Sequence, residues 1–165
     1  MFRFVLTFLS SLLAISLLAG CQPDAADLAA TNEAQLLMFK DPYCGCCTDW
    51  ADHVAQSGLS ISAQDQHDMA AIKEQFGVAP QYQSCHTAVW HDHPYVFEGH
   101  VPAPLIEKFL TSPPPDAIGL AVPGMPVGSP GMEIDSHFQP YDVLLLKTDG
   151  TSSVYARVTK QSQQY

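Results

Sequence analysis

Three cysteines lie within four residues in the stretch Tyr43-Cys44-Gly45-Cys46-Cys47, and this spacing keeps their thiols close whatever the backbone does. Such a cluster can form a disulfide, bind a soft metal ion, or do each in turn. Cys44 and Cys47 have the C-x-x-C spacing of a redox dithiol. Cys46 has no use in a simple dithiol oxidoreductase, whereas Cu(I) favours a further thiolate because thiolates are soft and can bridge ions. A structural disulfide with a spare thiol is the alternative.

Further candidate ligands lie outside this stretch. Cys85 is a fourth thiol, and if Cys85-His86 lies on a strand, only one of the two side chains faces the site, for which we expect Cys85. His86 and His100 are candidate ligands or proton carriers, with hydrogen-bonded structural histidines as the alternative. Met125 and Met132 could supply thioether sulfurs to Cu(I), or simply fill a gap beneath a loop. Of the other histidines, His53 is expected to be a packed helix residue, and His91 and His93 are expected to lie solvated in a turn. His67 and His137 have no feature that marks them as ligands.

The elements expected around the thiols begin with a strand, a helix and a second strand. Residues 35–40 (QLLMFK) form a short apolar run that predicts a buried strand, which Asp41-Pro42 ends. Helical spacing of apolar residues predicts a helix over residues 47–56. Residues 59–63 alternate and predict a second strand, and residues 68–76 predict a second helix.

The next segments complete a recognisable order. Residues 87–90 and 95–97 predict a hairpin, and residues 104–110 (PLIEKFL) predict a short helix. A parallel βαβ unit followed by an antiparallel hairpin and a helix is the thioredoxin-like arrangement. In such a fold Cys44 lies in the loop above the sheet and Cys47 in the first helical turn, where free N–H groups and the helix dipole stabilise thiolates.

The remaining residues add to this arrangement. Residues 119–132 (GLAVPGMPVGSPGM) predict no helix or regular strand, and their apolar content favours a loop packed over the domain. Residues 142–146 and 153–158 flank Asp149-Gly150, which predicts a hairpin. Residues 160–165 are polar and are expected to fray. The predicted fold class is therefore α/β, a thioredoxin-like βαβ-ββα domain with an added C-terminal loop and β-hairpin.

The first twenty residues have the features of a signal peptide. Arg3 precedes an apolar run over residues 4–18 that is too short to span a bilayer comfortably. Leu18-Ala19-Gly20-Cys21 resembles a bacterial lipobox, in which Cys21 is lipidated; an ordinary signal peptide or an uncleaved anchor is the alternative. Gln22 favours sorting to the outer membrane, and the compartment is oxidising. We therefore expect a lipoprotein signal peptide over 1–20, a tether over 21–34 and the metal-binding domain over 35–160.

Composition limits the partners. Seven basic and seventeen acidic residues give a formal net charge of −10, which argues against nucleic acid because that ligand needs a basic face. An acidic protein attracts cations weakly. Apart from Cys21 the chain has four cysteines, but a domain of this length can build its own core and does not require disulfides for stability.

Four motifs together resemble the CopG-type copper-resistance family of Gram-negative bacteria. They are the 43–47 stretch with Trp50 and His53, then residues 84–88 (SCHTA), 98–102 (EGHVP) and 119–133 (GLAVPGMPVGSPGME). The resemblance covers residues 38–158. It implies a periplasmic, thioredoxin-like domain that binds Cu(I) and acts in copper redox handling. The metal-binding thiols that it implies are Cys44, Cys46, Cys47 and Cys85.

Three functional interpretations stay open. The first is a periplasmic protein of copper resistance that binds one or more Cu(I) ions, with copper ions, a lipid-anchored membrane and periplasmic copper-handling proteins as partners. The second is an enzyme, a thiol-disulfide oxidoreductase with Cys44 as nucleophile and Cys47 as resolving thiol. Cys46, where ordinary thioredoxins often have proline, weakens that interpretation. The third is a zinc-stabilised or disulfide-linked lipoprotein that acts through interaction.

Overall fold

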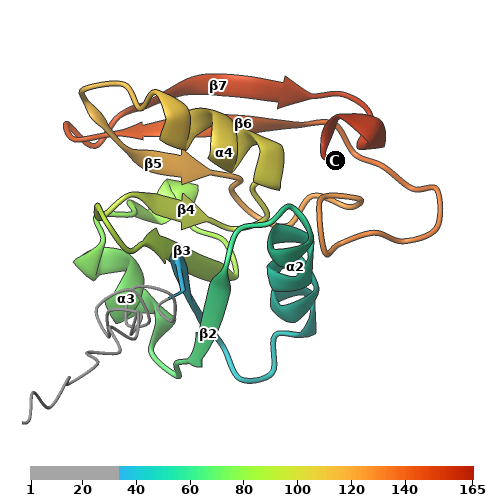
Figure 1. Cartoon of the computed structure of the whole chain (residues 1–165), viewed down its shortest axis with the longest axis horizontal. Coiled ribbons are helices and arrows are strands. Elements are labelled where there is room, and N and C mark those ends of the chain that lie inside the picture. Colours follow the sequence, from blue (N-terminus) through green and yellow to red (C-terminus); the bar gives the residue numbers. More distant parts are fainter. Residues whose placement is uncertain (1–33) are drawn as a thin grey trace, which may run out of the picture. The chain divides into compact units, whose positions relative to one another are not determined.

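A single mixed sheet runs through the described part of the chain, and its strands lie in the order β2-β1-β3-β4-β5-β6-β7 (Figure 1). The computed structural model describes residues 34–165, so the expected signal peptide, the lipidated Cys21 and nearly all of the expected tether lie outside the described residues. The strands are β1 (Leu36–Lys40), β2 (Ile61–Asp65), β3 (His86–Trp90), β4 (Val96–Glu98), β5 (Ala117–Ala121), β6 (Tyr141–Lys147) and β7 (Ser152–Val158). The helices are α2 (Gly45–Gln56), α3 (Met69–Gln75) and α4 (Ala103–Thr111), with short 3₁₀ turns η1 (Pro80–Tyr82) and η2 (Gln161–Gln163).

The predicted thioredoxin-like order is confirmed in the first half of the domain. β1 and β2 are parallel and joined by α2, while β3 lies antiparallel to β1 on its other side. β3 and β4 form the predicted antiparallel hairpin. β2 begins two residues later than expected, but the parallel βαβ unit is the one that the sequence predicts.

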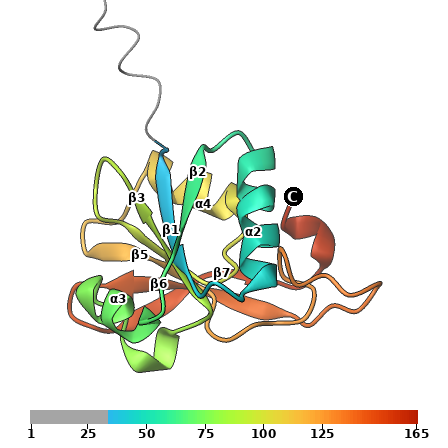
Figure 2. The same cartoon turned by 90° about the horizontal axis from the view of Figure 1, so that it is seen from below.

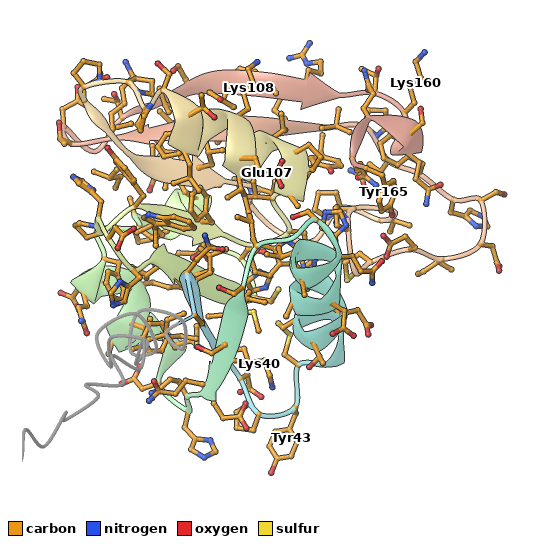
Figure 3. All side chains as sticks on the ribbon, viewed as in Figure 1. Lys40, Tyr43, Glu107, Lys108, Lys160 and Tyr165 are labelled. Carbon is orange, nitrogen blue, oxygen red and sulfur yellow. A yellow bond between two sulfur atoms is a disulfide. The ribbon has the colours of Figure 1, made fainter. Side chains whose placement is uncertain are left out.

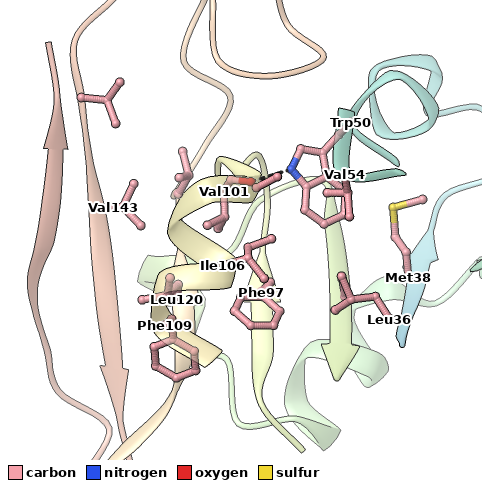
Figure 4. Packing of buried hydrophobic residues seen from close by; sticks show 14 of the residues in the cluster. Leu36, Met38, Trp50, Val54, Phe97, Val101, Ile106, Phe109, Leu120 and Val143 are labelled. Atoms are coloured by element: carbon pink, nitrogen blue, oxygen red, sulfur yellow. Dashed lines mark hydrogen bonds between the residues drawn. The ribbon is translucent and has the colours of Figure 1, made fainter. Parts of the chain in front are cut away.

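The two faces of the sheet pack against different helices. Leu36 and Met38 of β1 lie in one core with Trp50 of α2 and Phe109 of α4 (Figure 4). Phe39, the residue after Met38, stacks on Phe76 at the end of α3, with ring centroids 5.9 Å apart. Because successive side chains of a strand point to opposite faces, α2 and α4 cover one face of the sheet and α3 covers the other.

One strand was not expected from the sequence. Residues 119–121 were predicted to be irregular, and this is wrong, because Ala117–Ala121 form β5, parallel to β4 and antiparallel to β6. At Gly119 a Cβ atom would lie 1.8 Å from the carbonyl oxygen of Val96, so only glycine allows the two strands to pair. The glycine that argues against a strand is therefore the residue that permits it.

The end of the chain is also more ordered than predicted. The hairpin of β6 and β7 forms as expected and extends the sheet through β5 (Figure 2). Residues 160–165 do not fray: η2 follows β7, and Gln164 is completely buried. Gln164 accepts a hydrogen bond from the hydroxyl of Tyr141 and donates one to the carbonyl oxygen of Gly128 over 2.9 Å. This segment therefore holds the loop that follows β5, residues 122–133, against the domain.

Among the residues that the structure describes, no helix is long and apolar enough to cross a membrane.

Candidate metal centre

A tight turn carries the chain from β1 into the cysteine stretch. The Asp41 side chain accepts a hydrogen bond from the Tyr43 amide at 2.8 Å, and its carbonyl oxygen accepts one from the Cys44 amide at 3.0 Å. Cys44 is then the N-cap of α2, and its side chain makes no capping hydrogen bond, so its sulfur is available for other bonding. Tyr43 points away from the domain into solvent (Figure 3). The predicted position of Cys47 in the first turn of the helix is confirmed.

Four sulfur atoms meet at this end of α2. Cys44 and Cys47 form a disulfide, with their Cα atoms 5.4 Å apart. The sulfur of Cys46 lies 3.6 Å from that of Cys44, and Cys85 approaches from the start of β3. All four sulfur atoms lie within 4.8 Å of one another. Two thiolates on one metal ion, each about 2.3 Å away, can be at most about 4.6 Å apart, so small movements would let the reduced thiols share an ion.

The thiol of Cys85 also belongs to a second group of ligands. Its sulfur lies 3.2 Å from Nδ1 of His86 and 3.0 Å from Nε2 of His100. Only one side chain of Cys85-His86 was expected to face the site if both residues lay on a strand, and this condition is not met, because Cys85 precedes β3 and does not follow the alternation of the strand. Cys85 thus joins the cluster of four sulfurs to a cluster of one sulfur and two imidazoles.

The ring of His100 is held in one tautomer. It is fully buried, and its Nδ1 lies 2.7 Å from the carbonyl oxygen of Pro130. A carbonyl oxygen only accepts, so Nδ1 carries the proton and Nε2 presents a lone pair to Cys85. Burial lowers the pKa of His100, while the hydrogen bond to Pro130 and the carboxylate of Glu133 oppose that shift. A neutral imidazole aimed at a thiol is a suitable metal ligand.

His86 is the other buried imidazole of the site. Its ring lies against Trp50, with centroids 4.3 Å apart, and meets the ring of His100 edge-on. Its Nε2 has no hydrogen-bond partner among the described residues. Burial, followed by the charges of His100 and Lys73, lowers the pKa of His86 well below its usual value, so the ring is neutral. The unpaired Nε2 costs free energy, whereas Nδ1 is the nitrogen that lies near the Cys85 sulfur and could act as a ligand.

The thiol of Cys85 is protonated at neutral pH in the metal-free protein. Burial, together with the nearby charge of Cys46, raises the pKa of Cys85 to about 12, although a hydrogen bond from Ser84 opposes this. A bound cation would reverse this preference, because a metal ion stabilises the thiolate far more strongly than burial destabilises it. Metal binding at Cys85 is therefore expected to release a proton.

The glycine- and proline-rich loop covers the site, as its apolar content predicted. Gly131 packs on the first turn of α2: a Cβ atom there would lie 2.6 Å from the Trp50 nitrogen and 2.7 Å from the Cys46 oxygen. The hydroxyl of Ser84, next to Cys85, donates to the carbonyl oxygen of Gly124. Gly131 therefore packs on the backbone of Cys46 and Trp50, Gly124 contacts the residue before Cys85, and Pro130 contacts His100 itself.

The methionines of this loop are less clearly placed for ligation. Met125 is 54% exposed and Met132 is half-buried, so their role as thioether ligands stays a prediction. His53, a packed helix residue as expected, accepts a hydrogen bond from the Ala103 amide at 3.0 Å and thereby caps α4. His91 and His93 are exposed in the β3–β4 turn.

Several residues that shape the site carried little signal in the sequence. Nothing in the sequence pairs the carbonyl oxygen of Pro130 with His100, because peptide oxygens have no residue signature. Glu98 is different: a carboxylate at the end of an apolar strand (Val96-Phe97-Glu98) is unusual, and it is completely buried. That anomaly could have marked it as functional.

The donor set suits a soft metal ion. Four cysteine sulfurs and two neutral imidazoles converge at the site, and no carboxylate belongs to either ligand group among the residues described. Thiolates and imidazoles favour Cu(I), Cu(II) and Zn(II), whereas calcium and magnesium require oxygen ligands. With the Cys44–Cys47 disulfide closed, two of the four sulfurs are not available as thiolates. Metal capacity is therefore linked to the redox state of this pair.

Comparison with known proteins identifies relatives that are named for copper. Residues 82–132 match the family described as "Protein of unknown function, DUF411". None of the curated proteins matches at a significant level. The solved structure "Copper resistance protein copG- Form 2" is 41% identical with a TM-score of 0.69, and covers 74% of this chain and 96% of that chain. "Copper resistance protein copG- Form 1" is 40% identical with a TM-score of 0.70, and covers 76% of this chain and 98% of that chain. The chain therefore belongs to the CopG copper-resistance protein family and has its thioredoxin-like fold.

Proposed function

We propose that this protein binds Cu(I) through Cys44, Cys46, Cys47 and Cys85 and acts in copper resistance in the periplasm. The observation that carries the proposal is the convergence of four sulfur atoms within 4.8 Å on a chain whose relatives are titled copper resistance proteins. His86 and His100 would complete the coordination through the thiol that they share with the cluster. More than one ion is expected, because thiolates bridge Cu(I) ions and the two ligand groups have Cys85 in common.

Redox chemistry is expected to control this binding. Opening the Cys44–Cys47 disulfide takes two electrons and two protons and produces two thiols. The reverse step, closing the disulfide, releases two electrons, which could reduce two Cu(II) ions to Cu(I). The N-terminus of α2 favours the thiolate form of both cysteines through its free N–H groups and dipole.

The proposed location follows from the sequence. The lipobox-like segment ending at Cys21 would anchor the protein by a lipid, at the outer membrane by the residue that follows. Periplasmic copper-handling proteins would then be the natural partners for delivery or release. Palmitate labelling of the wild type and of a Cys21→Ser variant would test this proposal, and equal labelling of the two proteins would contradict it.

The test of copper binding is an anaerobic titration of the reduced, lipid-free domain with Cu(I) in competition with a chromophoric chelator. Thiols are counted before and after loading. We expect tight binding of more than one copper ion with all four thiols protected. Cys46→Ser is expected to lower the stoichiometry or the affinity, and an unchanged value would count against the thiolate cluster. Zinc is titrated in parallel, because equal retention of zinc would favour a structural metal site instead.

One observation favours a second candidate, thiol-disulfide exchange. The closed Cys44–Cys47 disulfide lies at the N-terminus of α2, where thioredoxin-like oxidoreductases hold their reactive pair. In that activity the Cys44 thiolate attacks a substrate disulfide, and Cys47 then resolves the mixed disulfide, so that the substrate is reduced to two thiols and the protein is oxidised. Insulin reduction that survives Cys46→Ser, without tight copper binding, would support this candidate over copper binding.

A further inference from the structure

A closed polar network lies inside the domain, directly behind the ligands on the opposite face of the sheet. Lys73 of α3 is 4% exposed and donates to Glu98 at 2.6 Å and to Thr87 at 3.1 Å. The hydroxyl of Thr87 donates to the second oxygen of Glu98 at 2.7 Å. The first oxygen of Glu98 also accepts a hydrogen bond from the Ser84 amide at 2.6 Å. Glu98 and Thr87 are fully buried.

The partners of Glu98 lie on either side of two ligands. Ser84 immediately precedes Cys85, and Thr87 immediately follows His86, so the carboxylate holds the chain at both ends of this dipeptide. Thr87 and Glu98 are also paired in register across β3 and β4. Glu98 itself is two residues before His100, the third member of the Cys85 ligand group.

Fold stability alone does not explain this network. Removing two charges from water costs several kcal/mol for each ion, and well-packed apolar replacements of buried pairs are often neutral or stabilising. A buried ion pair is therefore better explained by the geometry that it fixes than by the stability that it adds. Here the network fixes the geometry of the segments that carry the ligand group of Cys85, His86 and His100.

We infer that the Glu98 carboxylate is a positioning group that sets the spacing of Cys85, His86 and His100, with Lys73 as its buried counter-ion. The inference deepens the proposed function and rests on it for the identity of the metal. Glu98 does not contact a metal in this scheme, and it acts by fixing the backbone at Ser84 and the side chain at Thr87. The hydrogen bonds to Ser84 and Thr87 are the essential property, and the negative charge is not.

Two double variants separate these properties. Lys73→Met with Glu98→Gln removes both charges but keeps a carbonyl oxygen for the Ser84 amide and an N–H group for the Thr87 hydroxyl. Lys73→Met with Glu98→Leu removes the charges and the hydrogen bonds together. The matched control is Arg157→Met with Asp142→Asn, which removes an exposed ion pair of 2.6 Å from the same sheet.

Cu(I) affinity of each reduced protein is measured by chelator competition, and folding by circular dichroism. We expect the Leu pair to lose about 10- to 100-fold in affinity, the usual effect of removing an outer-sphere partner of a metal ligand, while the Gln pair and the control do not. Wild-type affinity in a folded Leu pair would overturn the inference. An equal loss in both pairs would also overturn it, because the charge would then be the cause.

A variant with a smaller change keeps the inference testable if the Leu pair does not fold. Thr87→Val removes the two hydrogen bonds of the Thr87 hydroxyl, to Lys73 and to Glu98, and retains the ion pair, while Thr87→Ser keeps the hydroxyl. The affinity is expected to fall for Val and to be restored by Ser, and equal affinity of Val and wild type would refute the inference.

The same proteins are also examined without metal, by ¹⁵N NMR of the histidine ring nitrogens. In the wild type His100 is expected to show a protonated Nδ1 and an Nε2 that is shifted by its contact with the Cys85 thiol. The Leu pair is expected to lose the Nε2 shift and the Gln pair to keep it. This result stands even if the wild type binds no copper, so failure of the proposed function and failure of the positioning role are distinguishable.

Discussion

The carbonyl oxygen of Pro130 accepts a hydrogen bond of 2.7 Å from Nδ1 of His100. This contact joins the covering loop to the end of β4 and selects the tautomer whose Nε2 faces Cys85. The position of the covering loop and the orientation of the His100 ring therefore depend on each other. Any change that moves the loop off α2 is expected to alter the orientation of His100 as well.

His100→Asn tests the role of the ring nitrogen itself. The asparagine amide can still donate to Pro130, but the atom corresponding to Nε2 is absent. We expect the Cu(I) affinity to fall by at least about tenfold, while the free energy of unfolding of the metal-free protein changes less. His93→Asn, in an exposed turn, is the control. Wild-type copper affinity in His100→Asn would remove His100 from the ligand set.

Copper affinity is expected to rise with pH because of Cys85. Its pKa is raised to about 12, chiefly by burial, so copper must displace a proton from this thiol at neutral pH. Each such thiol contributes about a tenfold rise in apparent affinity per pH unit. In chelator competition at several pH values, the Cu(I) affinity of Cys85→Ser is expected to depend less steeply on pH than the affinity of the wild type. The same pH dependence in both proteins would show that Cys85 does not lose a proton on binding.

Acid is expected to destabilise the metal-free fold partly through His53. Burial lowers the pKa of His53 in the folded state below 6.5, although Glu133 opposes the shift. As the pH falls below about 6.5, the unfolded chain takes up a proton that the folded protein does not, so the free energy of unfolding decreases, by at most about 1.4 kcal/mol per pH unit for this group.

His53→Gln keeps an acceptor for the Ala103 amide but cannot titrate. Urea denaturation of both reduced, metal-free proteins across this pH range is expected to show a shallower decrease in the variant. His67→Gln, which removes an exposed imidazole, serves as the control. Identical pH profiles of His53→Gln and wild type would contradict this role of His53.

Gly131→Ala tests the packing of the loop on α2. The residue has φ +81°, and an added Cβ would press on the backbone at Trp50 and Cys46. Gly150→Ala is a matched control, because Gly150 has φ +79° with nothing within 4 Å of an added Cβ. The positive φ alone costs about 1 kcal/mol, and the clash is expected to raise the cost at Gly131 to at least about 2 kcal/mol. Denaturant titration measures the free energy of unfolding of both variants. Equal losses of stability in Gly131→Ala and Gly150→Ala would mean that the loop accommodates the methyl group.

Local sequence patterns predicted those parts of the structure that depend on residues close together in the sequence. The thiol cluster follows from the spacing of Cys44, Cys46 and Cys47, and the βαβ unit follows from hydrophobic periodicity. β5 was missed because Gly119 weakens a strand pattern, while the pairing that requires glycine comes from Val96 on another strand. Burial of Gln164 depends on partners at Tyr141 and Gly128, which a local polar sequence does not indicate.

The second ligand group depends on tertiary structure in the same way. His100 was a candidate from its type alone, whereas its contacts with Cys85 and Pro130 join residues 15 and 30 positions away. The network of Lys73, Thr87 and Glu98 joins α3, β3 and β4. Such contacts form only when the sheet has assembled, so no window of sequence contains them.

The separation of Cys85 from the other three thiols also affects how copper changes the stability of the fold. Cys44, Cys46 and Cys47 lie within four residues of the sequence, so an unfolded chain still offers three soft ligands, and only Cys85 and the histidines require the assembled sheet. A ligand stabilises a fold only by the difference between its affinities for the native and the unfolded chain. The rise in melting temperature on copper loading therefore reports what Cys85, His86 and His100 add, and underestimates the total affinity of the native site.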